Sequence, residues 1–400
     1  MPELIYLDHA ATTPLHPEAL EAMLPFLRGR FGNPSSAHRL GAEASRAVDG
    51  ARRAVAAVLG CGPNEVVFTS GGTESINAAI KGVAQAQRLA RVGDHIVTTG
   101  IEHHAVLHAC QHLERFGFEV TYLPVDGDGL VSPDAVAEAV TRRTVLVSVM
   151  TANNEVGVIQ PIADIAAAVR ERGKALRRRI VVHTDAVQAA NALSLDVGAL
   201  GVDLLSLSSH KFRGPKGSGI LYLRRGVPFL AQMDGGGQER QRRSGTENVA
   251  GIVGTAVALE IAQRSREAYA ATCRRLRDRL IEGAMASVPG VTLNGDAERR
   301  LPNNVSLAFE GADARLLVEL LDDEGIACSA GSACTAQVVE PSHVLMAMGL
   351  PLERALGTVR FSLSAETTEA EIERLLRALP PAVERARRES ELAAAAATAV

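Results

Sequence analysis

The sequence predicts an α/β protein in which a mostly parallel β-sheet is covered by helices on both faces. Short, continuous runs of apolar and β-branched residues recur through the first two thirds of the chain, with helical stretches between most of them. Strands that are apolar along their whole length are typical of parallel sheets, because both faces of such sheets are buried. The pattern changes from about residue 250, which predicts a second, smaller α+β unit. We assign residues 15–259 to the large domain, and residues 1–14 and 260–400 to the small one.

The first predicted strand, 66–69, runs through a Ser-Gly-Gly turn into a helix from about 73 to 91. Further strands of the large domain are predicted at 95–98, 118–123, 144–150, 180–184, 203–208 and 219–223. The small domain is predicted to contain a long helical segment at 251–286, a strand at 304–309, a helix at 312–323 and a strand at 360–363. The Ala-rich tail from residue 392 is expected to fray.

Composition excludes several classes of protein. The chain has 400 residues, of which 46% are hydrophobic and 22% charged, so it is not a disordered chain. The net charge of −4 gives no reason to expect a nucleic-acid partner. No apolar run is long enough to span a membrane, and the N-terminus lacks the basic start of a secretory signal. Five widely spaced cysteines favour a reducing cytoplasm over a disulfide framework.

Lysine is rare in this chain, and one of its lysines occupies an informative place. Only Lys81, Lys174, Lys211 and Lys216 occur among 42 basic residues. Lys211 follows a predicted buried strand within SSHKFRGPKGSG (208–219), so its amine should emerge at the carboxyl end of that strand. A lysine placed there can form a Schiff base with a carbonyl cofactor. Taken alone, an exposed loop lysine is the commoner outcome.

Three further segments supply the other groups that one cofactor needs. Asp185 ends an apolar strand, where a carboxylate can keep a pyridine nitrogen protonated; a helix N-cap is the alternative. The turn TSGGTES (69–75) offers free N–H groups and a helix dipole to a phosphate, although ordinary strand-to-helix turns look similar. The histidines of IEHHAV (101–106) can cover a flat ring or can be exposed caps. Together with Lys211, these groups predict pyridoxal 5′-phosphate.

Ten ordered motifs, from residue 5 to about 385, resemble the NifS/IscS-type cysteine desulfurases. They are YLDHAATTP (6–14), FGNPSS (31–36), TSGGTES (69–75), EH (102–103), NNE (153–155), DAVQ (185–188), HK (210–211), RSGTE (243–247), GSACT (331–335) and RFSL (360–363). Ten motifs in a fixed order are a far stronger signal than any one of them. The resemblance implies a homodimer of the pyridoxal-phosphate-dependent transferase fold type I, within the class V aminotransferase superfamily.

The same resemblance implies a role for individual residues. Lys211 would hold the cofactor and move protons, Asp185 would pair with the ring nitrogen, and His103 would stack on the ring. Gln188 would bond the ring hydroxyl, Asn154 would contact the ring and the substrate carboxylate, and Arg360 would clamp that carboxylate. The implied phosphate ligands are Gly72, Thr73, Ser208, His210 and, from the other subunit, Thr246.

The implied reaction converts L-cysteine to L-alanine and leaves the sulfur on Cys334 as a persulfide. The GSACT sequence in the loop 328–340 resembles class I of the family, whose cysteine loop is long. The sulfur would then pass to an acceptor protein, such as an iron–sulfur scaffold or another sulfur carrier. No resident metal is implied, only transient ligation of an iron–sulfur cluster by Cys334. Cys328 is a second thiol near the first, and we expect it to be a small buried residue without a catalytic role.

Two other functions remain open from the sequence. A related pyridoxal enzyme, such as a selenocysteine lyase or a class V aminotransferase, would use the same cofactor groups, although Cys334 argues against an aminotransferase. A non-catalytic partner protein on the same scaffold is the third alternative. The presence of both Lys211 and Asp185 argues against it.

Overall fold

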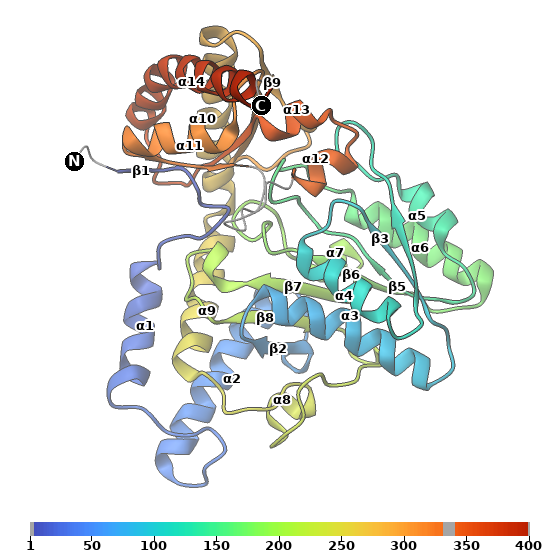
Figure 1. Cartoon of the computed structure of the whole chain (residues 1–400). Coiled ribbons are helices and arrows are strands. Elements are labelled where there is room, and N and C mark those ends of the chain that lie inside the picture. Colours follow the sequence, from blue (N-terminus) through green and yellow to red (C-terminus); the bar gives the residue numbers. More distant parts are fainter. Residues whose placement is uncertain (1–3, 331–340, 399–400) are drawn as a thin grey trace.

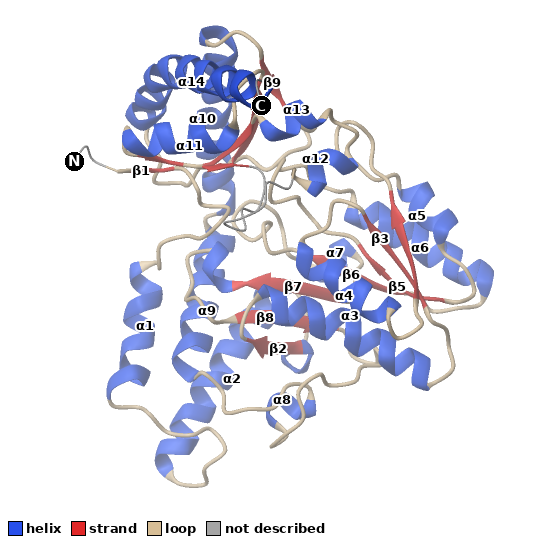
Figure 2. Ribbon diagram, in the orientation of Figure 1, coloured by secondary structure: helices blue, strands red, loops and turns tan. Residues whose placement is uncertain are grey.

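The computed structural model describes residues 4–330 and 341–398, which contain three sheets of seven, four and two strands (Figures 1 and 2). The large sheet has seven strands in the order β2-β8-β7-β6-β5-β3-β4. These are β2 (Val66–Thr69), β8 (Gly219–Leu223), β7 (Leu204–Ser208), β6 (Val181–Asp185), β5 (Thr144–Ser148), β3 (His95–Thr99) and β4 (Glu119–Leu123). All neighbours are parallel except β8, which runs antiparallel to both β2 and β7. The predicted strands of the large domain are therefore present, with ends that differ by one or two residues.

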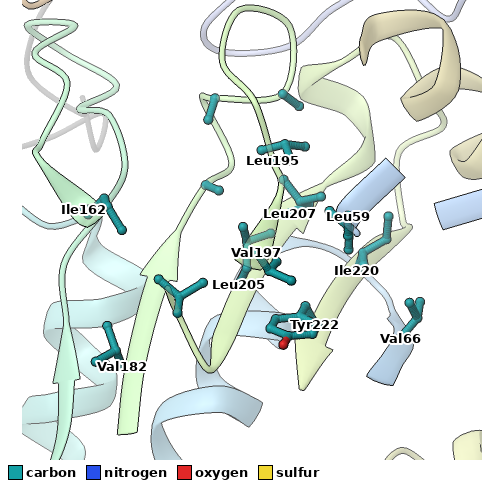
Figure 3. Packing of buried hydrophobic residues seen from close by; sticks show 14 of the residues in the cluster. Leu59, Val66, Ile162, Val182, Leu195, Val197, Leu205, Leu207, Ile220 and Tyr222 are labelled. Atoms are coloured by element: carbon teal, nitrogen blue, oxygen red, sulfur yellow. The ribbon is translucent and has the colours of Figure 1, made fainter. Parts of the chain in front are cut away.

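Both faces of the large sheet are buried, as the continuous apolar runs predicted. Along β2, Phe68 packs into one core while its neighbour Val67 packs into the core on the opposite face. The first core also contains side chains of α2 (Arg39–Leu59), α6 (Ile162–Leu176) and α9 (Val249–Arg264), and Figure 3 shows part of it. The second contains α3 (Gly72–Leu89) and α4 (His104–Glu114). The remaining helical segments of the large unit are α1 (Pro17–Arg28), η1 (Pro63–Glu65), α5 (Pro133–Ala139), α7 (Val197–Leu200), η2 (Ser209–Lys211) and α8 (Gln238–Gln241).

The smaller unit is built on an antiparallel sheet in the order β12-β13-β10-β9. Its strands are β12 (Ser329–Ala330), β13 (Thr358–Ser362), β10 (Asn304–Phe309) and β9 (Val291–Leu293). Its helices are α10 (Arg266–Ser287), α11 (Ala314–Asp323), α12 (His343–Ala347), α13 (Leu352–Leu356) and α14 (Glu369–Thr398). Figure 1 shows α10, α11 and α14 together above the end of the large sheet.

The N-terminal segment joins the smaller unit. Strand β1 (Ile5–Tyr6) pairs in parallel with β11 (Ile326–Ala327), and Ile5 and Leu7 pack into the smaller unit's core. Helix α9 packs on α1 and α2, whereas α10 contributes to the core of the smaller unit. The predicted boundary at 259/260 falls within α9 (Val249–Arg264), and the division into residues 15–259 and residues 1–14 with 260–400 stays a prediction.

Two expectations about helices differ from the structure. The single helical segment expected at 251–286 is two helices, because Ser265 ends α9 and its hydroxyl donates a hydrogen bond back to the Ile261 carbonyl at 2.8 Å. The tail does not leave the helix at residue 392, because α14 continues to Thr398. Alanine is the best helix-forming residue, which accounts for this extension. No helix in the described ranges is long and apolar enough to cross a membrane.

Candidate active site

A cavity of about 220 Å³ lies where the carboxyl ends of the parallel strands face the smaller unit. Ten of the twelve residues predicted for the site line it: Gly72, Thr73, His103, Asn154, Asp185, Gln188, Ser208, His210, Lys211 and Arg360. The other lining residues are Ala10, Ala11, Ile76, Met150, Ala152 and Val187. Ligands of α/β proteins bind outside the carboxyl ends of the strands, and the position of this cavity follows that rule.

The start of α3 forms a glycine cradle at one side of the cavity. Gly71 has a φ of +154°, and a Cβ on Gly72 would lie 3.0 Å from the Val187 Cγ2 and 3.2 Å from the Ser208 Cβ. Only a residue without a side chain lets the backbone approach Ser208 this closely. The N–H groups of the first helical turn have no partners within the helix, and the helix dipole adds positive potential there. The cradle therefore fits a phosphate group.

Asp185 is buried at the end of β6. Its Oδ1 accepts a hydrogen bond from the Val187 N–H at 2.9 Å. Burial raises the pKa of its carboxyl to about 6, while this hydrogen bond and the charge of Lys211 act in the opposite direction. A cation bound against Asp185 would favour the ionised carboxylate further. Asp185 therefore suits the protonated nitrogen of a pyridine ring.

Lys211 ends the short turn η2, which follows β7 directly. Its Nζ donates hydrogen bonds to the carbonyl oxygens of Ala10 and Ala11, each at 2.6 Å. The pKa of its amine is lowered to about 8, mainly by burial and in addition by the charge of Arg360. A substantial fraction of this amine is therefore neutral and nucleophilic near neutral pH, unlike that of an ordinary lysine.

His103 caps α4 and faces the cavity. Its Nδ1 accepts a hydrogen bond from the Ala105 N–H at 3.1 Å, which places the proton of the neutral ring on Nε2. His103 keeps exposed surface and lines the cavity, and partial removal of its ring from water, followed by the charge of Lys211, lowers the pKa of His103 to about 4. The imidazole is therefore neutral, as a ring that stacks on an aromatic cofactor requires.

Arg360 reaches the cavity from strand β13 of the smaller unit. Its Nη1 donates to the Asn154 carbonyl at 2.9 Å, and its Nη2 pairs with the Asp8 Oδ1 at 2.7 Å. Its Nε is buried and has no hydrogen-bond partner among the described residues. Nη1 and Nη2 each have a second N–H beyond these bonds, and Arg360 lines the cavity, so this guanidinium is a suitable anchor for a carboxylate.

A match to a family model identifies the protein family of this chain. The model for aminotransferase class-V matches residues 5–375. The chain belongs to this family. A cysteine desulfurase IscS from Methanosarcina thermophila is 49% identical over 388 residues, which cover 97% of this chain and 94% of the relative. A solved NifS-like protein superimposes with a TM-score of 0.88 at 41% identity, covering 94% of this chain and 98% of the other.

A second solved structure is titled as SspA in complex with cysteine. It is 36% identical, has a TM-score of 0.78, and the alignment covers 91% of this chain and 100% of the other. The predicted fold type, the dependence on pyridoxal phosphate and the assignment to the cysteine desulfurases of the class V family are confirmed by these similarities. The chain is thus a pyridoxal-phosphate-dependent cysteine desulfurase.

One of the predicted site residues in the described ranges does not line the cavity. Thr246 is exposed and does not line the cavity. The segment that contains it is attached near the glycine cradle, because the Arg243 Nε pairs with Glu74 of α3 at 2.8 Å. Cys334 lies outside the described residues, so its predicted role stays a prediction.

Sequence reasoning missed the contribution of residues 8–12. Besides accepting from Lys211, the Ala10 carbonyl accepts a hydrogen bond from Gln188 at 3.0 Å. The Thr12 hydroxyl lies 3.1 Å from the His210 Nδ1. The motif at 6–14 was part of the family resemblance, but it gave these residues no role. Backbone carbonyls leave no trace in residue type, so only side chains such as the Asp8 carboxylate and the Thr12 hydroxyl could have been singled out from the sequence.

Proposed function

We propose that this cysteine desulfurase removes the sulfur of L-cysteine at the cavity beside Lys211 and releases L-alanine. The observation that carries the proposal is the gathering of Lys211, Asp185 and Arg360 around one cavity with a glycine cradle. The three groups serve a carbonyl cofactor, its ring nitrogen and a substrate carboxylate, respectively. The similarity to a structure with bound cysteine supports the choice of substrate.

Pyridoxal phosphate fits the cavity by the chemistry of its lining. The start of α3, with Ser208 and His210, would hold the phosphate; Asp185 would hold the ring nitrogen, and Gln188 the ring hydroxyl. His103 would cover the face of the ring. When bound, the cofactor supplies a ring that accepts electrons from the substrate Cα.

Lys211 would both hold the cofactor and move the proton of the substrate Cα. Its amine has a pKa of about 8, close to the working pH that favours general acid–base catalysis. Arg360 and Asn154 would orient the substrate through its carboxylate. Since Arg360 comes from the smaller unit and Lys211 and Asn154 from the larger one, the reaction would depend on contact between the two units.

Cys334 would receive the sulfur. Its thiolate would attack the substrate Sγ and form an S–S bond, while the Cβ–S bond breaks and its electron pair returns to the substrate carbon skeleton. Protonation of that skeleton yields L-alanine, and the persulfide remains on Cys334. Burial raises the pKa of the Cys328 thiol well above its usual range, so that thiol stays protonated and is a poor nucleophile.

The site would be completed by a second copy of the chain, whose Thr246 would reach the phosphate. Thr246 is exposed and does not line the cavity of its own chain. A residue that serves the partner's site would have this placement. Its loop is held by the Arg243–Glu74 ion pair and, further back, by the buried pair of Arg52 and Glu239 at 2.7 Å. The product sulfur would pass to an acceptor protein in the cytoplasm. All four described cysteines are free, which agrees with a reducing compartment.

The activity is tested by incubating the purified, cofactor-loaded protein with L-cysteine and a thiol reductant. Equal amounts of alanine and sulfide are expected. Borohydride reduction followed by peptide mapping should place the cofactor on Lys211, and the exposed Lys216 provides a matched control as Lys216→Ala. A cofactor label on Lys216, or sulfide formed without alanine, would contradict the proposal.

The shared site is tested by mixing two impaired variants. Lys211→Ala and Thr246→Val should each have low activity alone. In a mixed dimer, one of the two sites combines an intact Lys211 with an intact Thr246. Random subunit exchange should therefore restore about a quarter of the wild-type activity. No recovery despite exchange shown by mass spectrometry would rule out a contribution of Thr246 to the partner's site.

A further inference from the structure

Asp8 is the only acidic side chain paired with Arg360 in the described parts of the chain. The two side chains are 20% and 9% exposed, and they lie 2.7 Å apart. Asp8 does not line the cavity itself. Arg360 does line the cavity, so Asp8 can act on a bound ligand only through the guanidinium.

The hydrogen-bond count of Arg360 leaves room for a ligand. A guanidinium has five N–H donors. The Asn154 carbonyl accepts from Nη1, Asp8 accepts from Nη2, and the Nε–H is buried without a partner among the described residues. Two fixed acceptors therefore determine the rotation of the guanidinium plane. Arg360 lines the cavity, and its Nη1 and Nη2 each have one further N–H for a carboxylate.

Asp8 is itself held firmly. It forms a parallel bridge with Ser362, and the N–H of Ser362 donates to the Leu7 carbonyl at 2.7 Å. On the other side of Asp8, the Ala10 N–H donates to the Ser362 hydroxyl at 2.8 Å. Since Ser362 and Arg360 belong to the same strand, β13, Asp8 and Arg360 are fixed on one framework.

We propose that Asp8 is a positioning residue for recognition of the substrate α-carboxylate: it holds Arg360 in the orientation in which the remaining N–H groups can form a fork. This inference rests on the proposed role of Arg360 as the carboxylate anchor. Bidentate binding by arginine depends on the orientation of a planar group, so a guanidinium that can rotate binds a carboxylate less well. The N-terminal segment thus contributes to substrate binding without touching the substrate.

The test compares ligands with and without a carboxylate on the cofactor-loaded enzyme. Binding of L-alanine and of L-alanine methyl ester is followed through the absorbance of the cofactor, so that no turnover is required. KM and kcat for L-cysteine are measured beside it. The variants are Asp8→Ala, which removes the acceptor, and Asp8→Asn, which retains an oxygen acceptor. The control is Asp203→Asn, because Asp203 is a similarly buried acid paired with Arg179 and Arg224 outside the cavity.

Asp8→Ala should weaken L-alanine binding roughly tenfold or more and raise KM by a similar factor, with a smaller change in kcat. Binding of the methyl ester should change little, because it lacks the anion that Arg360 recognises. Asp8→Asn should bind L-alanine within about threefold of wild type, because the hydrogen bond to Nη2 is retained. Asp203→Asn should leave both ligands unaffected.

The proposal is overturned if Asp8→Ala leaves L-alanine binding unchanged, if the methyl ester is weakened equally, or if Asp8→Asn binds as poorly as Asp8→Ala. A separate variant, Arg360→Lys, keeps the charge but loses the fork. If Arg360→Lys retains the preference of the enzyme for the free acid, the carboxylate role of Arg360 fails first. If Arg360→Lys loses this preference and Asp8→Ala retains it, only the role of Asp8 fails.

Discussion

The amine of Lys211 should titrate more than two pH units below that of an ordinary lysine. Burial is the main cause, the charge of Arg360 adds to it, and together they lower the pKa to about 8. The two carbonyls that accept from Nζ are compatible with the neutral form, because a neutral amine still has two N–H donors. Its lone pair is then available to attack a carbonyl carbon.

The expected effect is large enough to measure without ambiguity. At pH 7, an amine with a pKa of about 8 is roughly 9% neutral, whereas an ordinary lysine with a pKa of about 10.4 is neutral in roughly 0.04% of molecules. At pH 7 and with equal access of the reagent, Lys211 should therefore react with a neutral acylating reagent roughly 200-fold faster than a lysine with the ordinary pKa of about 10.4.

The assay is competitive acetylation of the cofactor-free protein across pH 6 to 11, at trace levels of acetic anhydride. Mass spectrometry quantifies the Lys211 peptide relative to a lysine-containing reference peptide in the same tube. The labelling of Lys211 should rise with a midpoint near pH 8. Arg360→Gln should move this midpoint upward, because a neighbouring cation is removed. Asp185→Asn should move it downward, because an anion that favours the ammonium form is lost.

A Lys211 midpoint at or above 10.4 would refute the reasoning, since the amine would then be no more nucleophilic than an exposed lysine. Shifts in the same direction for Arg360→Gln and Asp185→Asn would refute the electrostatic part of it. In that case, burial alone would control the titration.

Three further predictions concern the ring acid, a buried ion pair and the two thiols. Asp185→Asn should lower kcat roughly 10²-fold or more with the cofactor still bound, because the ring nitrogen loses its anionic partner; near-normal turnover would contradict this role. Arg52→Met should lower the free energy of unfolding by about 3–5 kcal/mol in urea denaturation, because it leaves the buried Glu239 carboxylate without its cation. Adding Glu239→Gln should restore much of this loss. A change in the free energy of unfolding below about 1 kcal/mol for Arg52→Met would contradict this account. Cys334→Ala should abolish the persulfide detected by mass spectrometry after a pulse of L-cysteine, whereas Cys328→Ala should retain it; the reverse pattern would assign the sulfur to Cys328.

Several parts of the fold could be predicted from residue patterns because their physical cause is local. Every residue of β7 and β8 is buried, and leucine occupies three of the five positions of β7 while β8 reads GILYL; burial on both faces favours such mainly apolar strands without strict alternation. Their relative direction could not be predicted. Strand β8 runs antiparallel to its neighbours, and the apolar pattern of a buried strand does not indicate whether it pairs in a parallel or an antiparallel direction.

The active site likewise contains residues that could be predicted from the sequence and a contact that could not. Lys211 and Asp185 were recognisable because each follows a strand with a chemically specific side chain, and the carboxyl ends of parallel strands meet at one edge. The pairing of Asp8 with Arg360 was not recognisable, because 352 residues separate them along the chain.

The sequence by itself determined the family, the cofactor chemistry and ten of the residues at the cavity, because these depend on residue type and on motifs of a few neighbouring positions. Only the tertiary structure decided the protonation states of the site and the role of the N-terminal segment. The pKa values of Lys211, Asp185 and His103 depend on how completely each group is removed from water and on which charges surround it. Those surroundings come from segments far apart in the chain. The charges around Lys211 include Arg360 and Asp8, so its environment is complete only when the smaller unit packs against the larger one.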